Sequence, residues 1–300
     1  MTTSLNLDST KLNKHWKANL SLTISPRPNK SVLSKCHHYG PLRVQRPFYP
    51  ESDLCPHLYI LHPPGGFVAG DDISISVHAL SGAQCLLTTP AAGKFYGAKN
   101  RTESQYQKTT LNIDSNASIE WLPQETIVFD SAKANNQCNI NVQKSSTLFY
   151  WETFCLGRLK SGETFSSGFI NQNIQIYCAD KLIHIEKNQL NALSDIYKSP
   201  AGFNNQPVFG SMISFSAAYL LKENIKLIEL LEKELFDLSE IAKTDEQPFK
   251  IALTQKNELL IARFLGSNAA KAQQLYKFIW QRLRPIAKNV PACPPRIWNT

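Results

Sequence analysis

The sequence lacks several features that would assign it to a specialised class of protein. None of its apolar runs approaches the roughly 20 consecutive residues that a membrane-spanning helix needs. Residues 1–6 also lack the basic flank and apolar core of a secretory signal. We therefore expect a cytoplasmic protein that does not associate with membranes.

Motifs for catalysis and for nucleotide binding are also lacking. The chain has no glycine-rich loop followed by Lys-Ser/Thr, no G-x-G-x-x-G before a helix, no G-x-S-x-G elbow and no H-E-x-x-H helix. Ser, His and Asp all occur, but no pattern pairs a nucleophile with a base. The sequence therefore predicts a protein that is not an enzyme and that binds no cofactor permanently.

The seven cysteines form no Cys-x-x-Cys pair, and an odd number scattered over 300 residues argues against a disulfide framework. Two short segments, Cys36-His37-His38 and Cys55-Pro56-His57, carry side chains that bind nickel or zinc well, and His62 lies nearby. Adjacent histidines on a strand point to opposite faces, so His37 and His38 cannot both bind one ion without a bend. We interpret these residues as ordinary surface or core residues.

The formal net charge is +8, which could suit nucleic acid or an acidic protein surface. The basic residues are spread along the chain, however, and no block of them is interleaved with aromatic residues as a platform for bases. The densest group lies near the C-terminus, at Arg282, Arg284, Lys288 and Arg296. We interpret this group as a solvated or partner-facing surface and expect no nucleic-acid partner.

From about residue 15 to 188 the chain contains short runs in which apolar and polar residues alternate. Gly, Asn, Asp and Ser separate these runs, a pattern typical of β-strands. No amphipathic helix of useful length interrupts them, which disfavours a parallel sheet built with crossover helices. Segments beginning near Gln84, Ser118 and Thr147 repeat a turn-then-strand unit roughly every 30 residues, which suits stacked β layers.

From about residue 189 to 300 the pattern changes to mixed helix and strand. The sequence predicts, in order, a loop over 190–210, a helix over 223–243, strands over 249–253 and 259–265 with a turn at Asn257, and a helix over 269–284 that is capped by Ser267 or Asn268 and ended by Pro285. No linker rich in Gly or Ser separates the two parts. We therefore expect a single structural unit over residues 1–300.

Several motifs follow one another along the chain. In residues 62–71, HPPGGFVAGD, prolines and glycines force an irregular turn that ends in Asp71. The others are GPLRVQRPFYP at 40–50, IEWLPQETI at 119–127, LGR at 156–158, GETF at 162–165 and PRIW at 295–298. This series closely resembles the UreD (UreH) family of urease accessory proteins, over nearly the whole chain. The first glycine of that family's Gly-Gly-Asp motif is Ala69 here, whereas Gly70 and Asp71 are in place.

The resemblance implies a mainly β fold with β-helix-like stacked strands and a helix-bearing C-terminal part. It also implies a non-enzymatic scaffold or chaperone that binds urease apoprotein and docks UreF, which recruits the GTPase UreG. Nickel would pass through as cargo on its way to the urease active site. GTP binding belongs to UreG by this resemblance, which agrees with the lack of a phosphate-binding loop in the present chain.

Carboxylates in or beside apolar strand runs are the candidate residues for nickel passage. An unpaired buried carboxylate is costly, so it needs a partner, a proton, water or a cation. We expect Asp71, Glu152, Glu163 and Glu186 to line a wet channel that holds hydrated Ni²⁺ loosely enough to release it. The alternative is an ordinary role, as a cap of backbone N–H groups for Asp71 and as a solvent-facing edge residue for each glutamate.

The C-terminal helices and tail are predicted to face UreF, with Arg296 and Trp298 as anchors, because apolar residues among basic ones bind partners well. An alternative from another class is a β-helix enzyme that acts on an acidic polysaccharide. Such an enzyme would need two acids about 5 to 9 Å apart across an open cleft. Enclosed, separated acids would instead indicate conduction.

Overall fold

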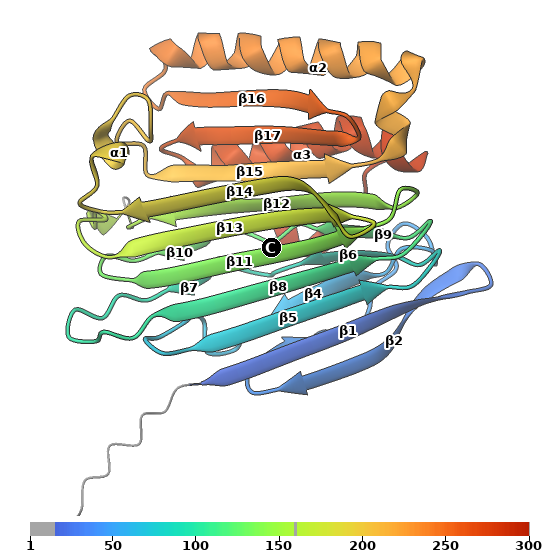
Figure 1. The fold of residues 1–300 in the computed structure, drawn as a ribbon, viewed down its shortest axis with the longest axis horizontal. Helices are drawn as coiled ribbons and strands as arrows, with labels where there is room; N and C mark the ends of the chain where they lie inside the picture. The colour runs from blue at the N-terminus through green and yellow to red at the C-terminus, as the bar shows by residue number, and fades with distance from the viewer. Residues whose placement is uncertain (1–15, 159–160, 300) are drawn as a thin grey trace, which may run out of the picture.

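Alternating burial along the strands explains why this sequence forms β-sheets. In β5 (Asp72–Ala79), Ile73, Ile75 and Val77 are buried while the residues between them are half-buried, and this period of two places one face of a strand in a core. The computed structural model describes residues 16–158 and 161–299 (Figure 1). Strands make up 46% of the described residues and helices 20%, so the predicted mainly β fold class is confirmed.

The first sheet has seven strands, with parallel pairing through its centre and an antiparallel strand at each edge. In spatial order these strands are β14 (Lys181–Asn191), β13 (Phe169–Cys178), β11 (Lys133–Val142), β8 (Gln105–Ile113), β5, β1 (Lys17–Arg27) and β2 (Lys30–Tyr39).

The second sheet lies behind the first in Figure 1 and has ten strands. In spatial order its main strands are β16 (Phe249–Lys256), β17 (Leu259–Gly266), β15 (Val208–Phe215), β12 (Thr147–Leu156), β9 (Ser118–Trp121), β6 (Gln84–Thr88), β4 (His57–Leu61) and β3 (Arg43–Val44). Two short strands, β7 (Gly93–Phe95) and β10 (Thr126–Val128), pair with each other, and β10 also pairs with β12.

From β4 to β13 the chain passes back and forth between the two sheets, so that the main strands it adds to each sheet lie side by side and parallel. The predicted turn-then-strand units near Gln84, Ser118 and Thr147 become β6, β9 and β12, which pair in parallel in that order. The expected β-helix-like stacking is therefore confirmed for this part of the chain. Connections without helices suffice because each turn of the chain crosses from one sheet to the other.

After β14 the chain adds three antiparallel strands to the second sheet. β16, β17 and the turn at Asn257, whose φ is +53°, lie where the sequence predicts them. β15 begins inside the predicted loop, and most of it was missed. All eight of its residues are buried, so its sequence lacks the alternation that reveals a strand with one solvated face.

In the described part of the chain three α-helices accompany the sheets: α1 (Asp195–Lys198), α2 (Lys222–Ile241) and α3 (Ala269–Lys288). Asn268 caps α3, as predicted, but the prediction that Pro285 ends this helix is wrong. The helix continues through Pro285 for another turn because Arg284 and Lys288 are both held by the buried carboxylate of Glu120. Within the described ranges, no helix combines the length and the apolar character that crossing a membrane requires.

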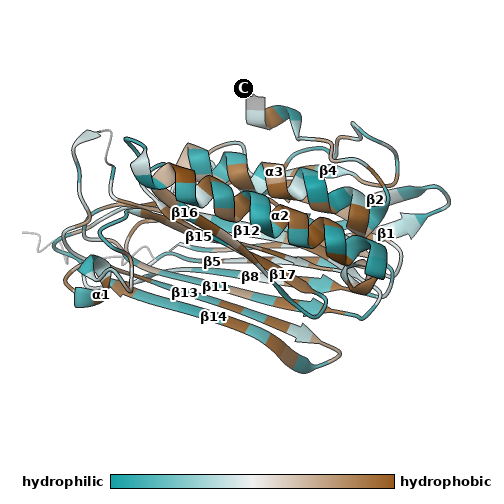
Figure 2. Ribbon diagram, turned by 90° about the horizontal axis from the view of Figure 1, so that it is seen from above, coloured by the Kyte–Doolittle hydropathy of each residue, from teal (hydrophilic) through white to brown (hydrophobic). Residues whose placement is uncertain are grey.

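Three layers follow from this arrangement, and Figure 2 shows them from above: α2 with α3, the second sheet, and the first sheet. One apolar core fills the space between the sheets, with Leu20, Ile140 and Ile174 among its fully buried members. Another fills the space between the second sheet and the helices and contains Trp151 and Trp280. Each large side chain in such a core contributes about 1.5–3 kcal/mol of gross hydrophobic stabilisation.

Candidate functional site: a polar band between the sheets

Polar side chains cross the otherwise apolar space between the sheets. Strand register aligns them in two facing rows, which together we call the polar band: Asn136, Gln172 and Asn188 on the first sheet, and Glu152, Ser211 and Arg263 on the second, with Glu186 beside Asn188. Their strands place these side chains inward because they occupy the same phase of the alternation as the apolar core residues. Burying so many polar groups is costly unless they bond to one another.

Glu152 lies at the end of its row in the polar band and is 6% exposed. Its carboxylate accepts hydrogen bonds from Asn136 Nδ2 at 2.7 Å and Gln172 Nε2 at 3.4 Å, and none of the described residues forms an ion pair with it. Burial raises the pKa of Glu152 because these amide donors only partly offset the loss of water. Asn136 Oδ1 and Thr153 Oγ1 are buried without a hydrogen-bond partner in the described part of the chain.

Glu186 lies at one end of the polar band and has different partners. The hydroxyl of Ser211 donates to one carboxylate oxygen, and the Arg263 guanidinium donates to the other at 3.1 and 3.2 Å. His184, on the same face of β14, has its Nε2 3.9 Å from that second oxygen. Burial lowers the pKa of His184, so its imidazole is neutral near pH 7.

Each end of the polar band meets a hollow. Glu186, Ser211 and Arg263 line a groove of about 1000 Å³ between β14 and α2, which we call the side groove. Glu152 and Thr153 line a cavity of about 170 Å³ beside the glycine-rich turn, which we call the inner cavity. The band thus lies between two hollows, the side groove and the inner cavity, and its chemistry suits loose binding of a hydrated divalent cation.

Asp71 lies at the turn beside the inner cavity. Its carboxylate accepts hydrogen bonds from the backbone N–H of Val68 at 2.9 Å and of Trp16 at 3.4 Å, so it caps the turn. The turn itself needs glycine, because a Cβ on Gly66 would lie 2.6 Å from the Tyr96 ring. Asp71 therefore shapes the wall of the cavity, and its predicted contact with nickel stays a prediction.

Glu163 lies outside the polar band. It forms an ion pair with Arg158 and accepts a hydrogen bond from the backbone N–H of Asp130 at 3.0 Å. Burial opposes ionisation, but the Arg158 hydrogen bond and charge hold the pKa of Glu163 below its usual range. Of the four predicted nickel residues, the structure therefore brings only Glu152 and Glu186 together.

A second set of buried carboxylates lies on the other face of the second sheet, beneath α3. We call it the ion cluster, and it consists of Glu51, His57, Glu120, Trp280, Arg284 and Lys288. Glu120 is fully buried and accepts from Arg284 Nε at 3.0 Å, Lys288 Nζ at 2.6 Å and Trp280 Nε1 at 2.7 Å. Although burial opposes ionisation, Lys288 and Arg284 hold the pKa of Glu120 below its usual range.

The soft-ligand candidate Cys55-Pro56-His57 belongs to the surroundings of this ion cluster. Ligand atoms of Glu51, Cys55 and His57 lie within 4.8 Å of one another. Arg284 and Lys288 nevertheless already lie 4.0 Å from the Cys55 sulfur, and burial raises the pKa of this thiol to about 12. Two cations and a neutral thiol make the place unfavourable for a further positive ion.

The remaining predicted residues occupy the surface and the C-terminal tail. Cys36, His37 and His38 lie on the exposed edge strand β2, whereas His62 lines the inner cavity and packs on Phe67. Trp298 packs against Trp151 and Trp280 and donates to Thr88 Oγ1 at 2.9 Å, while Arg296 is exposed. The predicted partner role of Arg296 and Trp298 stays a prediction.

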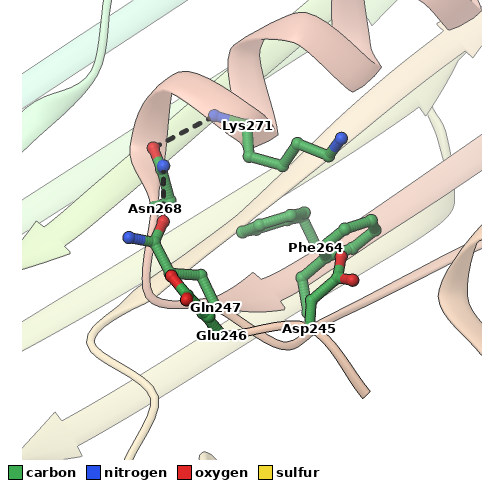
Figure 3. A pocket seen from close by; sticks show the side chains of 7 residues that line it. Asp245, Glu246, Gln247, Phe264, Asn268 and Lys271 are labelled. Carbon is green, nitrogen blue, oxygen red and sulfur yellow. Dashed lines mark hydrogen bonds between the residues drawn. The ribbon is translucent and has the colours of Figure 1, made fainter. Parts of the chain in front are cut away.

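Figure 3 shows another hollow, of about 370 Å³, at the N-terminus of α3. Asn268 accepts from the backbone N–H of Lys271 and donates to Gln247, so the polar groups there are satisfied by helix capping. No member of the polar band lines this hollow. We therefore assign it a structural role.

Sequence reasoning missed most of the polar band. Asn136, Gln172 and Ser211 are ordinary polar residues in strands, and Arg263 and His184 carry no local motif. The available signal for Asn136 and Gln172 was their position, because each interrupts the buried phase of an otherwise apolar alternation. Ser211 lies in a strand buried on both faces and gave no such signal. Only the register between strands shows that these interruptions meet.

The fold and the band define a class of protein: a β-helix-like scaffold of two stacked sheets that holds carboxylates in its interior. Residues 17–299 match the family model described as UreD urease accessory protein. Proteins named urease accessory protein UreD are 38% identical in Saccharophagus degradans (96% of this chain, 94% of the relative) and 38% identical in Enterobacter sp. strain 638 (98% and 100%). The chain belongs to the UreD urease accessory protein family.

Proposed function

We propose that this protein is a non-enzymatic scaffold in urease maturation and that nickel passes along its polar band toward urease apoprotein. Membership of the UreD family supports the role in urease maturation. The observation that carries the nickel proposal is the pair of in-register polar rows that lies between the side groove and the inner cavity.

The chemistry of the polar band suits passage better than storage. Glu152 accepts hydrogen bonds from two amide groups and forms no ion pair among the described residues, and Asn136 Oδ1 beside it lacks a hydrogen-bond partner there. A divalent cation would satisfy both groups and would favour the ionised form of Glu152. Oxygen ligands without thiolate bind nickel weakly enough for release.

The proposed partners are urease apoprotein, UreF and, through UreF, the GTPase UreG, all in the cytoplasm. The exposed Arg296 and the tail around Trp298 are our candidate surface for UreF. The alternative, an enzyme acting on an acidic polysaccharide, has less support. Glu152 and Glu186 are only 6% and 8% exposed, so a polymer chain could not reach both carboxylates.

The experiment that tests the proposal replaces Glu186 or Glu152 by Gln in cells that lack their own UreD. We expect urease from these cells to contain much less nickel, while UreF and urease apoprotein still copurify with the variant. The matched control is Glu163→Gln, which removes an acid outside the polar band. Normal nickel in urease from the Glu152→Gln and Glu186→Gln cells would refute the proposed path.

A further inference from the structure

The side groove exists because the second sheet is wider than the first. β17 and β16 continue past β14, the edge strand of the first sheet, so one face of β16 and the part of β17 around Arg263 are left uncovered. α2 forms the far wall, with Phe236 and Lys243 near the groove, and Lys250 and Arg263 belong to the floor. The end of the polar band at Glu186 opens here.

Arg263 occupies this opening. Its guanidinium contacts Glu186 at 3.1 Å; the arginine side chain is 56% exposed, whereas that of Glu186 is 8% exposed. The guanidinium therefore lies between the buried carboxylate and the solvent in the groove. Because arginine does not lose its proton in proteins, it presents a permanent positive charge to any cation that approaches Glu186.

The side groove carries a net positive charge, because four cationic side chains line it against the two carboxylates of Glu186 and Glu240. Lys243 is paired with Glu240 at 2.7 Å, but Lys187 and Lys250 have no carboxylate partner in the described ranges. The groove therefore repels a free cation and attracts a carboxylate. Ile185 and Phe236, which are 44% and 60% exposed, add apolar surface that a docked segment could cover.

We propose that Arg263 closes the groove end of the polar band, and that an acidic segment of a partner protein opens it by docking in the side groove and drawing the guanidinium away from Glu186. This proposal rests on the proposed function. The exchange leaves no charge unpaired, because the docked carboxylate takes over the guanidinium while the cation takes over the buried carboxylate of Glu186. Once Arg263 has moved, a carboxylate oxygen of Glu186 and Nε2 of His184, 3.9 Å apart, offer two ligand atoms to a divalent cation.

The test measures Ni²⁺ binding to the full chain by titration calorimetry. We expect Arg263→Gln to bind Ni²⁺ about fivefold more tightly than the wild type, because the guanidinium no longer competes with the cation for the carboxylate of Glu186. Arg263→Lys, which keeps the charge, should bind like the wild type. The matched control, Arg282→Gln, removes an arginine of α3 that is paired with Glu234 outside the groove and should change nothing.

A second measurement uses the wild-type chain, so it does not depend on the folding of a variant. A hexaglutamate peptide should bind the protein and tighten Ni²⁺ binding, and both effects should weaken in Lys187→Gln/Lys250→Gln. Equal or weaker Ni²⁺ binding by a folded Arg263→Gln, or a peptide that leaves the Ni²⁺ affinity of the wild type unchanged, would overturn the proposal.

These outcomes distinguish two claims: the closure of the polar band by Arg263, which we call the gate, and the passage of nickel along the polar band, which we call the path. If Glu186→Gln blocks nickel delivery to urease while Arg263→Gln binds Ni²⁺ no more tightly, the gate fails and the path stands. If Glu186→Gln delivers nickel normally, the path itself fails. Tighter Ni²⁺ binding by Arg263→Gln would then concern a site that does not serve delivery, and the gate would lose its function.

Discussion

The polar band and the ion cluster place the same residue type, buried glutamate, in opposite surroundings. Glu120 in the ion cluster is in contact with two cations and an indole N–H. Glu152 in the polar band is in contact with two amides and no cation among the described residues. Burial alone therefore does not define the role of a carboxylate, because the charge of its partners decides whether binding of a further cation is favourable.

The two regions also differ in what they hold together. The ion cluster joins α3 and residues around Glu51 to the second sheet, so its charges are structural. The polar band joins two sheets that an extensive apolar core already holds, so its charges are available for another task. We expect substitutions in the ion cluster to affect folding and substitutions in the polar band to affect nickel.

The largest effect should follow Glu120→Ala. Loss of this carboxylate leaves Arg284 and Lys288 in the interior without one of their partners, which should destabilise the fold by about 3–5 kcal/mol. Urea denaturation measures this free energy of unfolding. Glu234→Ala, in an exposed pair with Arg282, is the control and should cost less than about 0.5 kcal/mol. Equal effects of the two substitutions on the free energy of unfolding would contradict a structural role for the ion cluster.

Trp298→Ala should have the next largest effect on stability. The half-buried indole fills space against Trp151 and Trp280, so its removal should cost about 2 kcal/mol, below the range for fully buried tryptophan. Thermal unfolding measures the loss. Arg296→Ala, which removes an exposed neighbour, should leave stability unchanged and reduce UreF capture. Undiminished capture of UreF by both variants would remove this tail from the candidate partner surface.

The pH dependence of stability should distinguish the two regions. Although burial opposes ionisation of Glu51, the His57 hydrogen bond and the Arg284 charge lower its pKa from 4.5 to about 2. A lowered pKa in the folded state contributes stability that is present above about pH 4.5 and is lost as pH falls toward 2, here on the order of 1–2 kcal/mol.

Glu51→Gln should therefore flatten the acid limb of a stability curve measured by urea denaturation between pH 6 and pH 3. A limb as steep as that of the wild type would show that Glu51 does not supply this stability. The comparison between the two regions would then need another source of acid sensitivity in the ion cluster.

Glu152→Gln should have the smallest effect on stability. Burial raises the pKa of Glu152, so ionising this carboxyl group destabilises the fold once the pH exceeds the ordinary pKa of glutamate. The neutral amide of Gln at this position removes that cost. We expect a change within about 1 kcal/mol, toward greater stability at pH 8. A loss of several kcal/mol in urea denaturation would show that Glu152 is structural, like Glu120.

The sequence supports prediction of the fold better than prediction of the site. Alternation identified the strands of the β body, and the spacing of the segments at Gln84, Ser118 and Thr147 indicated their stacking. Glu120 and Glu152 cannot be told apart in this way, since both lie in apolar strands. Glu120 faces the helices and Glu152 faces the other sheet, and only long-range register sets their partners.

Two errors have the same origin. Most of β15 was missed because both its faces are buried, and α3 continues past Pro285 because Arg284 and Lys288 bind Glu120, 164 and 168 residues earlier in the chain. Tertiary contacts override the local signal in both places. Asp71 and Glu163 carry local signals as clear as those of Glu152 and Glu186, yet their bonds lie outside the polar band.

The central claim is that nickel binds between the sheets and not beneath α3. Anomalous diffraction at the nickel edge, from crystals grown with excess Ni²⁺, tests it most directly. The account predicts a nickel peak within bonding distance of Glu152 or Glu186 and none at Glu51, Cys55 and His57. A peak at these last three residues, or an interior without any peak, would contradict it.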